Sequence, residues 1–189
     1  MTEMMGWGDN ASWPDGDLSA RPLGEMEAMA SRSEPQAVGA QVWETLRELG
    51  SGRMRQNDLA AATRLRWARL ALLAATRKAE AATGDAQAAL TDAVYLRAAM
   101  IRTFGTGPTG GDRDPADLVR TVLHTIGRSP AEVASAAVGW RPASPADMLG
   151  LRRIKNLLTG LKGLDAYLDQ ADPLREEMAV WLSLIPRLP

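Results

Sequence analysis

The sequence predicts an all-α protein, built as a single bundle of about six or seven helices behind an N-terminal tail. Apolar residues recur with the 3.6-residue period of an amphipathic helix along most of the chain, and no segment alternates with period two for long enough to form a strand. A short helix-starting motif also recurs three times. With 189 residues, of which 46% are hydrophobic, the chain is long enough for one domain with a substantial core.

The first segment, residues 1–36, is expected to be an acidic tail, and the helical domain is expected to span residues 37–189. Glycine and proline recur through the tail, and its apolar residues keep no sustained period. Trp7 and Trp13 are unusual in such a segment. They are either anchors that dock on the domain or on a neighbouring subunit, or part of a loose terminus.

Three long helices are expected to follow the tail. The first covers about 38–49, where the apolar residues keep a helical period, and Gly50 is expected to end it as a C-terminal glycine. The second covers about 58–83 and is rich in alanine, leucine and arginine. The third covers about 86–103 and is separated from the second by a glycine.

The helix-starting motif reads DPADL at 114–118, SPAEV at 129–133 and SPADM at 144–148. Its first residue can cap a helix N-terminus, its proline stands where no amide hydrogen is needed, and its acidic residue is favoured by the helix dipole. The acidic residue can also close a capping box. We therefore expect short helices to begin at these three points, and a fourth to begin at Asp172-Pro173. The repeat marks helix starts and not a repeated functional element.

The apolar positions of these helices give the expected core. They are the positions that fall on the inward-facing stripe of each helix. The expected core residues are Val42, Leu46, Leu65, Leu72, Leu90, Val94, Ile101, Leu118, Val122, Ile154, Leu158, Trp181 and Leu182.

Few features of the sequence point to catalysis. There are no cysteines, which excludes disulfides and thiolate metal ligands. His124 is the only histidine, which leaves a metal site short of ligands. The stretch 105–110 matches G-x-G-x-x-G, but a helix and not a strand is expected before it, so the stretch predicts a flexible loop. We expect a protein that has no cofactor and no bound metal and is not an enzyme.

The apolar stretches are interrupted by arginine or lysine well before the roughly 20 residues that a membrane span needs. The first residues lack the basic start and apolar block of a signal peptide. We therefore expect a cytoplasmic protein without a membrane partner.

Basic residues are concentrated in two blocks, although the net charge of the chain is only −1. Residues 53–78 hold seven bases and a single acid, and residues 141–162 hold five bases and a single acid. Arginine dominates both blocks, which suits bidentate contact with phosphate oxygens. These blocks supply the candidate nucleic-acid-binding residues Arg53, Arg55, Arg64, Arg66, Arg69, Arg77, Lys78, Arg152, Arg153, Lys155 and Lys162.

Two details of the blocks support this hypothesis. Most bases of 53–78 are expected to lack an acidic partner nearby in the sequence, although salt bridges to the acidic segments or a solvated face remain the alternative. In the helix that begins at Ser144, steps of about 100° per residue put Arg152, Lys155 and Lys162 on one stripe. Leucines and Ile154 form the opposite stripe, so the basic side is expected to face outward.

The segments VWETLRELG, LAAATRLRWARLALL and LRRIKNLL, in this order, resemble the small all-helical subunits of multi-protein (class 1) CRISPR interference complexes. The resemblance covers most of residues 37–185. It implies a non-catalytic subunit, present in several copies, which contacts the RNA or DNA backbone in a ribonucleoprotein alongside other protein subunits. By chemistry, these contacts would come from Arg64, Arg66, Arg69, Arg152, Arg153 and Lys155.

Two other functions stay open. Residues 130–160 have the outline of a helix-turn-helix, which would make the protein a DNA-binding transcriptional regulator. The turn is one residue longer than usual and is crowded by Pro142 and Pro145, so base-reading geometry is in doubt. Alternatively, the protein is a helical adaptor whose basic faces meet acidic protein partners without nucleic acid.

Overall fold

The computed structural model describes residues 18–81, 86–138 and 144–189, and within these ranges every regular element is a helix. The α-helices are α1 (Leu23–Arg32), α2 (Ala40–Met54), α3 (Ala61–Ala81), α4 (Ala86–Phe104), α5 (Pro115–Ile126), α6 (Pro130–Val138), α7 (Pro145–Leu161) and α8 (Leu174–Leu182). Short 3₁₀ helices are η1 (Leu18–Ala20), η2 (Pro35–Ala37), η3 (Asp165–Tyr167) and η4 (Ile185–Arg187). The prediction of an all-α protein is confirmed for the described part of the chain.

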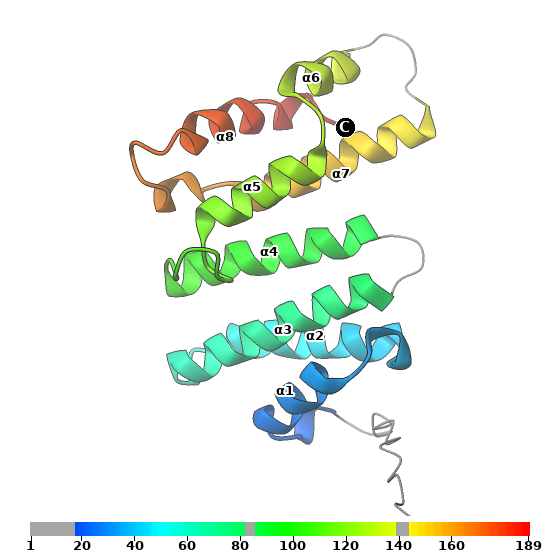
Figure 1. The fold of residues 1–189 in the computed structure, drawn as a ribbon, viewed down its shortest axis with the longest axis vertical. Helices are drawn as coiled ribbons and strands as arrows, with labels where there is room; N and C mark the ends of the chain where they lie inside the picture. The colour runs from blue at the N-terminus through cyan, green and yellow to red at the C-terminus, as the bar shows by residue number, and fades with distance from the viewer. Residues whose placement is uncertain (1–17, 82–85, 139–143) are drawn as a thin grey trace, which may run out of the picture.

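The helices are stacked along the long axis of the molecule, roughly in chain order (Figure 1). α1 lies at one end, α2 and α3 come next, α4 lies in the middle, and α5 to α8 form the other end (Figure 1). One buried apolar cluster joins α1, α2 and α3, and a second joins α4, α5, α7 and α8. A third lies between α6, α7 and the C-terminal segment, which is defined here as residues 181–189 and includes the end of α8. Along the described chain, no helix is both long and apolar enough to cross a membrane.

The prediction of a tail is wrong for residues 18–36, which form η1, α1 and the start of η2. Met26 and Ala30 of α1 are fully buried against α2 and α3. The indole Nε1 of Trp43 donates a hydrogen bond of 3.1 Å to the carbonyl oxygen of Pro35. The spacing of Leu23, Met26 and Ala30 is helical, but it is too short to stand out among the glycines and prolines that surround it. Trp7 and Trp13 lie outside the described residues.

Gly50 does not end α2, which continues to Met54. The glycine lies where α2 crosses α3, and a Cβ atom placed on it would lie 2.7 Å from the carbonyl oxygen of Trp67 and 2.9 Å from the Cβ of Ala71. Its small size is therefore needed for the close approach of two helices, and not for a turn. Local sequence does not distinguish these two uses of glycine.

The helix starts predicted by the repeated motif are confirmed, since α5, α6 and α7 begin at the three prolines. Ser144 and Asp147 form a complete capping box, and Ser129 exchanges the same pair of hydrogen bonds with Glu132. Asp114 instead accepts hydrogen bonds from three amides, which include the amide of Gly110 in the preceding loop. Burial alone would raise the pKa of Asp114, but these amides lower it below its ordinary value. The motif thus also attaches the loop before α5.

Most of the expected core residues are buried. The buried ones are Leu46, Val94, Ile101, Leu118, Val122, Ile154, Leu158 and Trp181. The others are half-buried at the edges of the apolar clusters, and they are Val42, Leu65, Leu72, Leu90 and Leu182. Leu72 and Leu90 line a pocket between α3, α4 and α5.

Candidate nucleic-acid interface

Four of the five bases of α3 are paired with carboxylates, although few acids lie near them in the sequence. Arg66 makes a bidentate pair with Glu27 of α1, and Arg69 Nε lies 2.6 Å from a carboxylate oxygen of Asp112. On the same helix, Lys78 lies 2.8 Å from Glu44, and Arg77 lies 3.0 Å from Glu80. Three of these four acids come from distant parts of the chain, so a charge count within 53–78 cannot reveal them. The alternative of salt bridges to acidic segments is the correct one for these residues.

Glu44 of α2 is the centre of the largest of these ion-pair groups. Its two carboxylate oxygens accept hydrogen bonds of 2.9 and 2.5 Å from Arg47, and one also accepts from Lys78. The hydrogen bonds from Arg47 lower the pKa of Glu44 to about 2, against the opposing effect of burial and with a further contribution from Lys78. This group attaches the C-terminal half of α3 to α2.

Replacing Glu44 with glutamine is expected to lower the free energy of unfolding by about 1 kcal/mol at neutral pH. Because the folded-state pKa is depressed, the contribution of Glu44 is present above its ordinary value of 4.5 and is lost as the pH falls toward about 2. Urea unfolding of both proteins at pH 7, 5, 4 and 3 should show the two free energies converging below pH 4.5. Glu48→Gln, at an exposed carboxylate 3.7 Å from Arg47, is the control and should change little. A pH-independent difference between Glu44→Gln and the native chain would contradict this assignment.

The remaining candidate bases near the α2–α3 connection make no ion pair within the described residues. Arg64 donates to the carbonyl oxygen of Met54 at 2.8 Å, and its guanidinium lies 5.6 Å from the ring centroid of Phe104. Arg53 donates to Gln56 and lies 5.9 Å from the Trp67 ring centroid. These two side chains therefore stabilise the α2–α3 connection. Arg55 is exposed, and no ion pair joins it to the described residues.

The basic face of α7 is different from that of α3. Its apolar stripe is buried as predicted, and the stripe consists of Leu151, Ile154, Leu157, Leu158 and Leu161. Arg152 and Lys162 are exposed, and neither side chain makes an ion pair or hydrogen bond within the described residues. Lys155 is half-buried, and its ammonium donates to the carbonyl oxygen of Leu188 at 3.0 Å. Lys155 thus holds the C-terminal segment against α7.

Arg153 lines a pocket of about 180 Å³ between α5 and α7, and Arg128 lines the same pocket. Arg128 lies outside both basic blocks of the sequence and is not among the predicted residues. It directly follows Gly127, the left-handed glycine (φ 60°) that ends α5. This glycine turns the chain so that Arg128 joins the basic residues of α7. A further guanidinium lies at the C-terminus of α7. It belongs to Arg102 of α4, which donates hydrogen bonds to the carbonyl oxygens of Gly160 and Lys162.

Residues 105–110 form a loop after a helix, as predicted, with left-handed backbone at Gly105 and Gly110. The loop is attached by Arg113, whose Nη1 donates to the carbonyl oxygens of Phe104 and Gly105 at 2.9 and 3.1 Å. His124 is exposed on α5. Within the described ranges, no three His, Cys, Asp or Glu side chains are grouped so that they could hold a metal ion.

The helices of the possible helix-turn-helix are present as α6 and α7, while residues 139–143 between them lie outside the described residues. Val133 of α6 is buried in the same cluster as Leu151 of α7, together with Trp181 and Leu188 from the C-terminal segment. α6 and α7 therefore share their apolar surface with the C-terminal segment as well as with each other.

No family model, curated protein or solved structure matches this chain. Its function is therefore inferred from the side chains themselves.

Proposed function

We propose that this protein is a non-catalytic helical subunit that contacts the phosphate backbone of RNA or DNA through the exposed face of α7. The observation that carries the proposal is the contrast between the two basic helices. Four of the five bases of α3 make ion pairs within the chain, whereas Arg152 of α7 and Lys162, which directly follows α7, are exposed and have no ion-pair partner among the described residues. The sequence from Met148 to Leu164 also contains no acid, so no partner is available within this stretch.

The length and environment of this face suit an extended anion. Lys162 follows Arg152 by ten positions, which is about 15 Å along a helix axis and long enough to meet more than one phosphate. Asn156 is exposed between them. Arg128 and Arg153 flank the N-terminal half of the face across the α5–α7 pocket. Guanidinium groups suit phosphate oxygens because they present several donors in one plane.

The resemblance to small CRISPR subunits leads to the same proposal by another route. It implies a subunit that contacts nucleic-acid backbone without catalysis, alongside other proteins and several copies of itself. Arg64, Arg66 and Arg69 would contribute least to such contacts, since they already bind groups of this chain. We propose that the interface is centred on α7, with Arg152 and Lys162 making the direct contacts.

The double variant Arg152→Ala with Lys162→Ala tests this proposal. Both side chains are exposed and the apolar stripe of α7 is untouched, so the fold should be unchanged. Affinity for a fluorescently labelled 30-nucleotide polyuridine RNA, measured by anisotropy, should fall roughly tenfold. A labelled 30-base-pair DNA duplex of mixed sequence should show whether the loss extends to DNA.

The matched control is Arg66→Ala with Arg69→Ala, which removes the same charge from α3. This variant should bind RNA within about twofold of the native chain, because its side chains already pair with Glu27 and Asp112. Equal affinity of the α7 variant and the native chain would contradict the proposal. Loss confined to one DNA sequence would favour the regulator with a helix-turn-helix at 130–160. The complete absence of nucleic-acid binding would favour the protein adaptor.

A further inference from the structure

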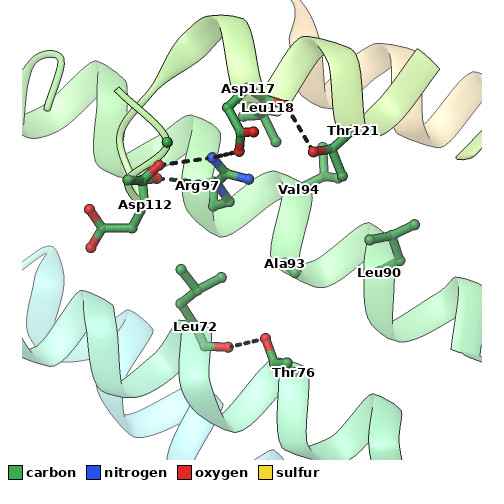
Figure 2. A pocket seen from close by; sticks show the side chains of 12 residues that line it. Leu72, Thr76, Leu90, Ala93, Val94, Arg97, Asp112, Asp117, Leu118 and Thr121 are labelled. Carbon is green, nitrogen blue, oxygen red and sulfur yellow. Dashed lines mark hydrogen bonds and ion pairs between the residues drawn. The ribbon is translucent and has the colours of Figure 1, made fainter. Parts of the chain in front are cut away.

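A pocket of about 290 Å³ opens between α3, α4 and α5, on elements that do not include α7 (Figure 2). Its walls are mainly apolar, with Leu72 from α3, Leu90 and Val94 from α4, and Leu118 from α5. Leu72 and Leu90 are half-buried, and both line this space. The size and lining are those of a site for a molecule smaller than a typical cofactor.

One guanidinium lies at the polar end of the pocket and is fixed in position. Arg97 Nε donates to the carbonyl oxygen of Asp112 at 3.2 Å, and Nη2 donates to the carbonyl oxygen of Gly111 and to the carboxylate of Asp117 at 3.1 and 2.9 Å. The Arg97 side chain is only 15% exposed. These bonds hold the planar group in one orientation, with three of its donor hydrogens used.

The third nitrogen of Arg97, Nη1, makes no hydrogen bond to the described residues. The guanidinium lies at the edge of the pocket, between Asp112 and the apolar wall formed by Val94 (Figure 2). This nitrogen is the donor of Arg97 that the chain leaves available to a ligand that supplies an oxygen. The pocket therefore combines an apolar body with a single well-oriented donor site.

The surrounding charges determine what kind of oxygen is accepted. Arg97 is already neutralised by Asp117, and Asp112 is neutralised by Arg69. A carboxylate ligand would place a further negative charge beside two existing carboxylates, which disfavours it. A neutral carbonyl oxygen accepts from Nη1 without this cost.

We propose that this pocket is a binding site for a small, mainly apolar molecule that carries a neutral carbonyl group. The carbonyl oxygen accepts a hydrogen bond from Arg97 Nη1, and the apolar part packs against Leu72, Leu90 and Val94. The site does not depend on nucleic-acid binding by α7, and either property can be absent without the other.

Three probes of similar shape test the assignment: acetophenone, ethylbenzene and benzoate. The full-length protein with ¹³C-labelled leucine and valine methyl groups is titrated with each probe and followed by NMR. Acetophenone should shift the methyl signals of Leu72, Leu90, Val94 and Leu118 in a saturable way. Ethylbenzene lacks the acceptor and benzoate carries a charge, so each should bind roughly tenfold more weakly than acetophenone.

Ala93→Leu is the variant of choice, because Arg97 also fixes the loop before α5 and its removal would disturb the fold. Ala93 is half-buried and lines the pocket, so the larger side chain should fill the space and abolish the methyl shifts. Ala136→Leu, at an exposed position of α6, is the control and should bind acetophenone like the native chain. Thermal unfolding of both variants checks that the fold is kept.

Equal affinity for ethylbenzene and acetophenone would overturn the role of Arg97 and would favour a site for an apolar side chain of a protein partner. Tighter binding of benzoate would overturn the preference for a neutral group. Methyl shifts that persist in Ala93→Leu, or that occur away from the pocket, would overturn the site itself.

Discussion

Replacing Trp43 with alanine is expected to lower the free energy of unfolding by about 3–5 kcal/mol. The Trp43 side chain is fully buried in the cluster that joins α1, α2 and α3, and its indole nitrogen donates to the carbonyl oxygen of Pro35. Removing the ring leaves a cavity beneath α1 and leaves a buried carbonyl oxygen without its donor. Urea unfolding gives the free energy, and amide hydrogen exchange in α1 should accelerate more than exchange in α8.

Trp43→Phe is the informative control for this prediction. It keeps most of the buried ring and loses the hydrogen bond to Pro35, so its cost should be clearly smaller, about 1–2 kcal/mol. A stability of Trp43→Ala within 1 kcal/mol of the native protein would contradict the packing of residues 18–37 on α2 and α3.

Gly50→Ala is expected to destabilise the protein by about 2 kcal/mol, although alanine favours helices. The intrinsic gain is about 1 kcal/mol. It is outweighed because the new Cβ would lie 2.7 Å from the backbone oxygen of Trp67, and relief of this contact requires α2 and α3 to move apart. The unfolding free energy and the melting temperature measure the net effect.

Gly52→Ala provides the opposite expectation on the same helix. Apart from the neighbouring residues and backbone of α2 itself, no atom lies within 4 Å of a Cβ placed on Gly52, so the substitution should stabilise the protein by about 0.5–1 kcal/mol. If both alanine variants were stabilised, α2 and α3 would not approach as closely as the structure indicates.

The helix starts could be predicted from sequence because their causes are local. A capping side chain, a proline and an acid occur within four residues, and α5, α6 and α7 begin where this motif predicts. The apolar stripe of α7 could be predicted because it also depends on local sequence: Leu151 and Leu158 belong to one continuous helix. Arg152 and Lys162 lie on the opposite, exposed side.

Features that depend on tertiary contacts could not be predicted. α1 has too few apolar residues to stand out, and it is stable because α2 and α3 supply the surface that buries Met26. Glycine also commonly ends a helix, so the residue type of Gly50 does not reveal its role. Only the position of Trp67 on another helix shows that Gly50 allows a close approach of two helices.

The candidate site was predicted in part for a similar reason. The bases of α3 are dense in sequence, but Arg66 pairs with Glu27 and Arg69 pairs with Asp112, both about forty residues away along the chain. No count within a local window contains these acids. Arg128 was missed because a single arginine beside a glycine has no distinctive pattern.

The salt dependence of RNA binding tests the central claim that α7, and not α3, contacts the phosphate backbone. The measurement is the slope of log K against log salt concentration for polyuridine RNA. The native chain, Arg152→Ala with Lys162→Ala, and Arg66→Ala with Arg69→Ala are compared. Losing two phosphate contacts to a single strand should make the slope shallower by about 1.4 in the α7 variant, whereas the α3 variant should keep the native slope. An unchanged slope in the α7 variant, or an equal change in the α3 variant of the same net charge, would contradict the claim.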